Sequence, residues 1–106
     1  MPEIEYSVLL DGGGINRLRV RAIKTAGRIV EFVVQYEALV AGTWHAVVRY
    51  DTAHGFVHRD ELFPDGRRLK MPLPFANRNL AFTFASLELR ARWREYRARF
   101  EKEALR

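Results

Sequence analysis

Apolar and polar residues alternate along most of residues 1–74, and no other feature of the chain constrains its fold as strongly. Successive side chains of a strand point to opposite faces of a sheet, so alternation predicts strands with one buried face. The pattern is clearest over four segments, residues 4–10, 17–22, 30–37 and 44–51. Short, turn-rich connections join them and no helical stretch intervenes. We therefore predict an antiparallel meander.

One face of this predicted sheet is apolar and the other is charged. Residues 56–63 and 69–73 predict two further strands, joined by the turn Pro64-Asp65-Gly66-Arg67. Pro72 and Pro74 indicate that the last strand is short or lies at an edge. The apolar face of the first four strands is predicted to consist of Ile4, Tyr6, Val8, Leu10, Leu18, Val20, Ala22, Val30, Phe32, Val34, Tyr36, Trp44, Ala46, Val48 and Tyr50.

Residues 77–105 change to a helical period and contain neither glycine nor proline. Asn77 or Asn79 can cap the first turn. Two apolar stripes run along the first half of this helix, and only the second continues beyond Ala91. We therefore expect the first turns to be covered on two sides, by the sheet and by either a loop of this chain or a second subunit. The stripes are Leu80, Phe84, Leu87 and Ala91, and Phe82, Leu89, Trp93, Tyr96 and Phe100.

These elements predict one α+β domain over residues 1–106, with an antiparallel meander of five to six strands packed against one long C-terminal helix. The chain has no cysteine, begins with an acidic alternating segment and has no apolar run long enough to span a bilayer. We expect a cytoplasmic protein without a membrane partner.

The net charge is +5 and is concentrated at the C-terminus, where residues 90–106 hold seven basic and three acidic residues. A localised positive surface suits a polyanionic partner such as nucleic acid or an acidic protein. Arg90 and Arg94 have no acidic residue four positions away, so we predict that they bind nucleic acid. The alternative is a solvated face with ion pairs at this spacing, namely Glu88–Arg92, Glu95–Arg99, Arg97–Glu101 and Arg99–Glu103.

Three arginines on the charged face of the second strand form a second candidate nucleic-acid surface. Arg17, Arg19 and Arg21 are expected to stand about 7 Å apart, a spacing that suits a phosphate backbone. Arg49 on the fourth strand joins this set. The alternative is that these arginines pair with acidic and amide side chains of the third strand, which are Glu31, Gln35 and Glu37.

Residues 49–61 hold two histidines, two arginines, a tyrosine and three carboxylates around a glycine. Metal-independent RNA cleavage needs a base, an acid and a cation near the phosphate, and histidine and arginine supply these. The candidate catalytic residues are Tyr50, His54, His58, Arg59 and Asp60.

Two alternatives apply to the same segment. In one, His54, His58 and a carboxylate hold a metal ion, although Gly55 argues against the helix that would align both rings. In the other, His54 and Asp51 cap a turn and Asp60 pairs with Arg59 or Arg67. We expect no metal and no cofactor.

Three sequence motifs lie between Tyr50 and Phe100, namely "YDTAHGFVHRD", "PDGR" and "WREYRARF". This stretch resembles a family of small prokaryotic proteins of unassigned activity. More loosely, "RYDTAHGFVHRDELFPDGR" resembles TumE-type toxins of bacterial toxin–antitoxin pairs, which carry two histidines where this chain has only His54. That resemblance implies a small toxin directed at translation or at RNA, with a DNA-binding antitoxin as partner.

Two functions therefore stand as hypotheses. The first is an RNase-like toxin that uses the histidine segment. The second is a non-catalytic module that binds nucleic acid or an acidic partner through its arginines. A third, structural hypothesis is a homodimer formed through the first turns of the helix, which are apolar on two sides.

Overall fold

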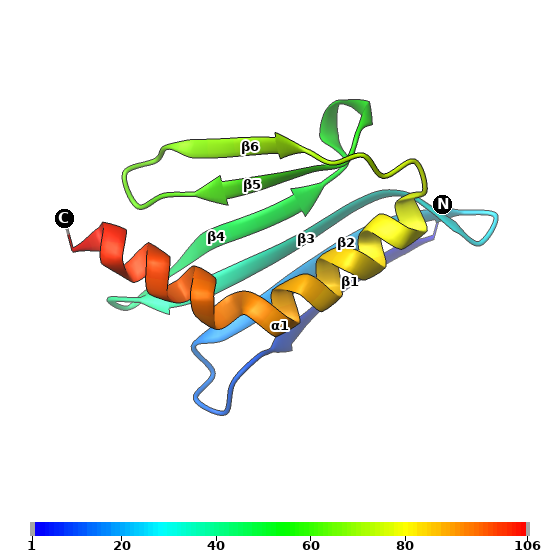
Figure 1. Cartoon of the computed structure of the whole chain (residues 1–106). Coiled ribbons are helices and arrows are strands. Elements are labelled where there is room, and N and C mark those ends of the chain that lie inside the picture. The colour runs from blue at the N-terminus through cyan, green and yellow to red at the C-terminus, as the bar shows by residue number, and fades with distance from the viewer. Residues whose placement is uncertain (1, 106) are drawn as a thin grey trace.

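The computed structural model describes residues 2–105 as a six-stranded antiparallel sheet with one long helix across it (Figure 1). The strands lie in the sheet in chain order, which is the predicted meander. The predicted α+β class is confirmed. In chain order the elements are β1 (Glu3–Leu9), β2 (Asn16–Thr25), β3 (Arg28–Val40), β4 (Thr43–Asp51), the short 3₁₀ turn η1 (Ala53–Gly55), β5 (His58–Leu62), β6 (Arg68–Pro72) and α1 (Arg78–Ala104).

Two-residue turns join the three central strands. Ala26-Gly27 connects β2 to β3 and Ala41-Gly42 connects β3 to β4, and all four residues have positive φ, between 51° and 80°. Such turns match the twist of the flanking strands, which keeps the pairing tight. Glycine adopts this conformation without strain, so each turn has one residue suited to it.

The core lies between α1 and the sheet. Val34, Tyr36 and Val48 are fully buried on the sheet side, and Ala85 and Leu89 are fully buried on the helix side. α1 packs mainly on β3 and less on β4. The β5–β6 hairpin lies to one side of the helix (Figure 1). α1 therefore leaves this part of the sheet face uncovered.

Asn77 caps α1, which was one of the two predicted alternatives. Its side-chain oxygen accepts hydrogen bonds from the backbone N–H groups of Asn79 (2.9 Å) and Leu80 (3.1 Å). Asn79 instead accepts a bond from the N–H of Ile29 (3.0 Å), which ties the helix start to β3. At the other end, the Arg97 guanidinium donates to the Leu39 carbonyl oxygen (2.9 Å). The helix is thus fixed along its length.

The predicted cover of the front of the helix by a loop of this chain is wrong, and cover by a second subunit stays a prediction. Leu80 and Leu87 are 62% and 63% exposed, and Phe84 is 44% exposed. The buried positions of the first turns are instead Ala81 and Ala85. Their small side chains let the helix approach the sheet closely, whereas sequence reasoning had weighted the large residues. Phe84 is only partly covered, with its ring 5.4 Å from that of Phe75 and 6.1 Å from that of Tyr50.

The predicted facing of β4 is correct at its end and wrong at its start. Tyr36 pairs with Val48 but Glu37 pairs with Ala46, so Val47 is the extra residue of a β-bulge. The bulge shifts the alternation by one residue. Trp44 and Ala46 therefore lie on the charged face, not with the apolar set.

His45 faces the helix, with its ring 5.4 Å from that of Phe100. No helix among the described residues is long and apolar enough to cross a membrane.

Candidate functional site

The sheet face turned away from α1, which we call the open face, gathers most of the predicted site residues. Strand pairing places Arg19, Gln35, Arg49, Asp60 and Lys70 in one row across β2 to β6. The adjacent row contains Arg21 on β2, Asp51 on β4 and His58 on β5. Two sets that were predicted separately, the arginines and part of the histidine segment, therefore share one surface.

Glu37 holds two of the predicted arginines. The Arg17 guanidinium lies 2.7 Å from its carboxylate and that of Arg19 lies 3.8 Å away. Gln35 adds a hydrogen bond to the same carboxylate (2.6 Å). The Glu37 side chain is only 7% exposed, whereas that of Arg19 is 54% exposed. The predicted pairing with the third strand is therefore correct for Glu37. The Arg19 guanidinium nevertheless presents its positive charge to solvent.

The same arrangement recurs twice further along the open face. Arg49 donates through Nε to Asp51 (2.7 Å) and through Nη1 to Gln35 (3.2 Å). Arg68 lies 3.5 Å from Asp60, which was predicted to pair with Arg59 or Arg67. Both carboxylates are buried and both guanidinium groups are exposed. Each buried acid thus supports a basic group that faces solvent.

Arg21 pairs differently, because its partner comes from the first strand. Its Nε donates to Glu3 (2.6 Å), and both side chains are about half exposed. Glu31, the predicted partner on the third strand, makes no ion pair within residues 2–105.

Two adjoining hollows lie between these arginines. One has a volume of about 230 Å³ and is lined by Arg21, Glu31, Arg49 and Asp51, among others. The other has a volume of about 350 Å³ and is lined by Arg19, Arg21 and Arg49, among others. Arg21 and Arg49 form a wall common to both. The guanidinium groups therefore surround a concave part of the open face.

His58 is buried on this face, between two buried carboxylates. Its Nδ1 lies 3.2 Å from Asp60 and its Nε2 lies 2.6 Å from Asp51, the latter contact outside regular hydrogen-bond geometry. The three residues could each offer one ligand atom to a metal, since these atoms lie within 4.8 Å of one another. The carboxylates, however, take different ring nitrogens, and an ion can bind only one of them. The imidazole is therefore held between two carboxylates, one near each ring nitrogen.

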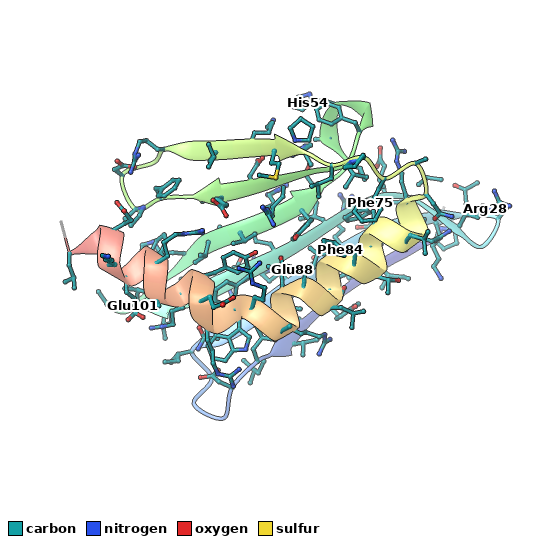
Figure 2. All side chains as sticks on the ribbon, in the orientation of Figure 1. Arg28, His54, Phe75, Phe84, Glu88 and Glu101 are labelled. Atoms are coloured by element: carbon teal, nitrogen blue, oxygen red, sulfur yellow. The ribbon has the colours of Figure 1, made fainter. Side chains whose placement is uncertain are left out.

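His54 is exposed on η1 and lies against the buried histidine, with ring centroids 6.3 Å apart (Figure 2). Its φ of 68° is unusual for a residue other than glycine. Asp51 accepts a hydrogen bond from the N–H of Ala53 (2.9 Å), as predicted for a turn cap. Phe56 was predicted in a strand, but this turn delays the start of β5 to His58. Two imidazoles therefore meet at the end of the open face, and one reaches solvent.

Tyr50 and Arg59 lie on the opposite face, the one on which α1 packs. Tyr50 is fully buried and its hydroxyl donates to Glu88 (2.6 Å), which also accepts from the Tyr96 hydroxyl (2.7 Å). Burial and then the Glu88 hydrogen bond raise the pKa of both phenols, that of Tyr96 to about 12. Arg59 approaches the Tyr50 hydroxyl at 3.5 Å. The structure therefore does not bring these two predicted residues to the histidines.

Sequence reasoning missed the role of Glu88, which it paired only with Arg92. That pair does form, at 3.6 Å. The available signal was position, because Glu88 directly precedes the buried Leu89 and a carboxylate beside a core position needs polar partners. Tyr50 and Tyr96 are core residues with polar tips that meet this need.

Arg90 and Arg94 are exposed on α1, on the other side of the sheet from the open face. Among residues 2–105, neither has a carboxylate within ion-pair distance. Of the other predicted helix pairs, Arg97–Glu101 forms (3.3 Å), whereas Arg99 pairs with Glu61 of β5 (3.0 Å). The six arginines predicted to bind nucleic acid therefore form two separate groups.

A family model described as a domain of unknown function, DUF7718, matches residues 1–105. The chain belongs to this family. Membership of DUF7718 agrees with the predicted resemblance to a family of unassigned activity. No curated protein and no solved structure matches the chain.

Proposed function

We propose that the open face binds single-stranded nucleic acid, with Arg19, Arg21 and Arg49 contacting phosphate groups. One observation carries this proposal: exposed guanidinium groups surround two adjoining hollows, and buried side chains hold most of them in place. Arginine suits phosphate because its planar donors form paired hydrogen bonds with phosphate oxygens.

Arg49 shows why the arrangement favours binding. Two of its donors are taken by Asp51 and Gln35, which fixes the plane of the guanidinium. Among residues 2–105 its Nη2 has no hydrogen-bond partner, and the side chain as a whole is 39% exposed. Ordering a free arginine on binding costs conformational entropy, and a side chain that is already ordered avoids much of this cost.

The spacing of the basic groups suits a flexible strand. Neighbouring strands lie about 4.8 Å apart, so Arg19 and Arg49, which flank Gln35 in one row, stand about 10 Å apart. Arg19 and Arg21 stand about 7 Å apart along β2. Trp44 lies at the start of β4, next to the β3–β4 turn, and the Arg17 guanidinium of β2 lies over its ring at 3.9 Å. Guanidinium planes and aromatic rings both stack on bases.

Binding is tested by titrating single-stranded RNA and DNA oligonucleotides and following fluorescence anisotropy at several salt concentrations. The open-face variant is Arg19→Ala with Arg21→Ala. Its matched control, Arg90→Ala with Arg94→Ala, removes the same charge from the other side of the sheet. We expect the open-face variant to bind more weakly and to lower the slope of log K against log salt by about 1.4, two phosphate contacts at about 0.7 each. Equal losses in both variants, or no salt-dependent binding, would refute the proposal.

An RNase-like toxin is a second candidate, favoured by the exposed His54 ring that lies on His58 at the end of the same face. His54 would accept the 2′-hydroxyl proton while the 2′-oxygen attacks phosphorus, and the leaving 5′-oxygen would take a proton from water. Arg49 would stabilise the charge on the phosphate oxygens. His58, held by Asp51 and Asp60, is buried and would act as a positioning residue.

This second candidate is tested by expressing the protein in bacteria and measuring growth and RNA integrity. We expect the wild type to slow growth and cleave RNA, and His54→Ala to lose both effects while retaining the wild-type circular dichroism spectrum. The Arg90→Ala, Arg94→Ala control should remain toxic. A DNA-binding antitoxin partner is tested by whether co-expression of the neighbouring gene restores growth. Identical growth and intact RNA in wild type and His54→Ala would eliminate the nuclease while leaving the binding proposal standing.

A further inference from the structure

α1 carries an exposed apolar stripe that this chain does not bury. We call Leu80, Phe84 and Leu87 the α1 stripe; they are 62%, 44% and 63% exposed. They follow one another at four- and three-residue spacing, so they lie along one side of the helix. Exposed apolar surface of this kind, when contiguous, marks an interaction site.

Phe84, in the middle of the stripe, contacts two aromatic rings beside the helix. The ring of Phe84 lies 5.4 Å from that of Phe75 and 6.1 Å from that of Tyr50, at the edge of the helix that faces β4 (Figure 2). Beyond Tyr50, Arg59 contacts the sulfur of Met71 on β6 at 3.5 Å, and Met71 is itself 44% exposed. Met71 is therefore a separate exposed apolar group on the uncovered β5–β6 hairpin, with the Arg59 guanidinium between it and Tyr50.

Two arginines stand at the C-terminal end of the stripe. The same four- and three-residue spacing continues through Ala91 to Arg94, and Arg90 lies one turn from both Leu87 and Arg94. Both arginines are exposed, and within the described part of the chain no carboxylate is within ion-pair distance of either. The Arg94 guanidinium lies over the ring of Trp93 at 4.4 Å, which keeps it against the helix. An apolar stripe thus ends in two cations without acidic partners.

We propose that this surface binds an amphipathic segment of an acidic partner protein. Apolar side chains of that segment would cover Leu80, Phe84 and Leu87, and its carboxylates would contact Arg90 and Arg94. Helix-in-groove recognition uses this combination of apolar anchors at helical spacing and charged contacts beside them. The site is distinct from the open face, because the sheet lies between them.

A second copy of this chain fits the surface less well. Residues 76–87 contain no Asp or Glu. Antiparallel self-pairing of the stripe would set the first turns of one α1 against Arg90 and Arg94 of the other, so no carboxylate would meet them. Parallel pairing would set arginine against arginine. Nucleic acid also fits less well, because a phosphate backbone would leave the α1 stripe in water.

The test uses the full chain and a synthetic helical peptide with leucine on one face and glutamate on the other. A peptide with lysine in place of glutamate is the matched control. We expect the acidic peptide to bind, the basic peptide not to bind, and backbone amide chemical shifts to change along the α1 stripe. Arg90→Ala with Arg94→Ala should weaken binding roughly tenfold, as expected for two exposed ion pairs. Arg19→Ala with Arg21→Ala should leave peptide affinity unchanged.

Several outcomes would overturn the proposal. Equal binding of both peptides, or an affinity that the Arg90→Ala, Arg94→Ala variant retains, would remove the role of the two arginines. A dimer in light scattering that Leu87→Ser dissociates would assign the stripe to a second copy. Loss of oligonucleotide binding in the Arg90→Ala, Arg94→Ala variant would assign it to nucleic acid.

Discussion

Glu88 shows how a carboxylate is accommodated beside the core of a small domain. Its side chain is 9% exposed, and its two oxygens accept the hydroxyls of Tyr50 and Tyr96. A buried carboxylate is costly unless hydrogen-bonded, and each phenol also needs an acceptor. The three residues satisfy one another, which ties the middle of α1 to β4. This arrangement requires both phenols to stay protonated. The protein should therefore lose stability at alkaline pH.

We predict that stability falls as the pH rises from about 10 to about 12. The pKa of Tyr96, raised to about 12 by burial and then by the Glu88 hydrogen bond, exceeds its ordinary value near 10. The folded protein thus holds protons that the unfolded chain releases, so the contribution is full below about pH 10 and is lost as the pH rises through about 12. Urea denaturation at about pH 9 and about pH 11 measures this loss. Tyr96→Phe should reduce it and Tyr6→Phe should not, since Tyr6 is 40% exposed. An unchanged pH dependence in Tyr96→Phe would contradict the assignment.

At the scale of elements, α1 has two apolar sides but only one of them holds the fold. Leu89 is fully buried against the sheet, whereas Leu87, two residues earlier, is 63% exposed. The two residues have the same chemistry and lie in the same turn of the same helix. They therefore separate the effect of burial from that of helix propensity.

We predict that Leu89→Ala lowers the free energy of unfolding by about 2–5 kcal/mol, the usual cost of removing a buried leucine side chain. Leu87→Ala should change it by no more than about 0.5 kcal/mol, because the side chain is largely in water and alanine suits a helix. Chemical denaturation of the two variants measures both values. A large loss in Leu87→Ala would mean that something covers the α1 stripe in solution, and light scattering would then show whether it is a second copy.

The strands, their order and the helix could be predicted because alternation and helical period are local properties of the sequence. The facing of Trp44 could not, because a bulge at Val47 leaves no mark in a run that is apolar on both sides of it. Most of the buried helix face was predicted correctly, namely Leu89, Trp93, Tyr96 and Phe100, but its first turns were missed for a related reason. Ala81 and Ala85 carry little hydrophobic weight, although their size is what allows close packing.

At the scale of the whole molecule, the sheet separates surfaces that look continuous in the sequence. Neighbouring residues of a strand point to opposite faces, so Tyr50 lies under the helix while Asp51 faces the other way. Arg59 is likewise separated from His58. A cluster of thirteen residues in sequence thus became two groups in space, whereas arginines from different strands met on the open face. Such cross-strand meetings depend on register, which local patterns do not specify.

Because the bulge places Trp44 on the open face, the molecule has one optical reporter on each side of its sheet. The chain has two tryptophans. Trp44 lies beneath Arg17 on the open face, and Trp93 lies beneath Arg94 at the end of the α1 stripe. Indole emission responds to its immediate surroundings, so a ligand arriving on either side of the sheet would disturb a different ring. Replacing one tryptophan by phenylalanine would leave a single intrinsic fluorophore that identifies the occupied side.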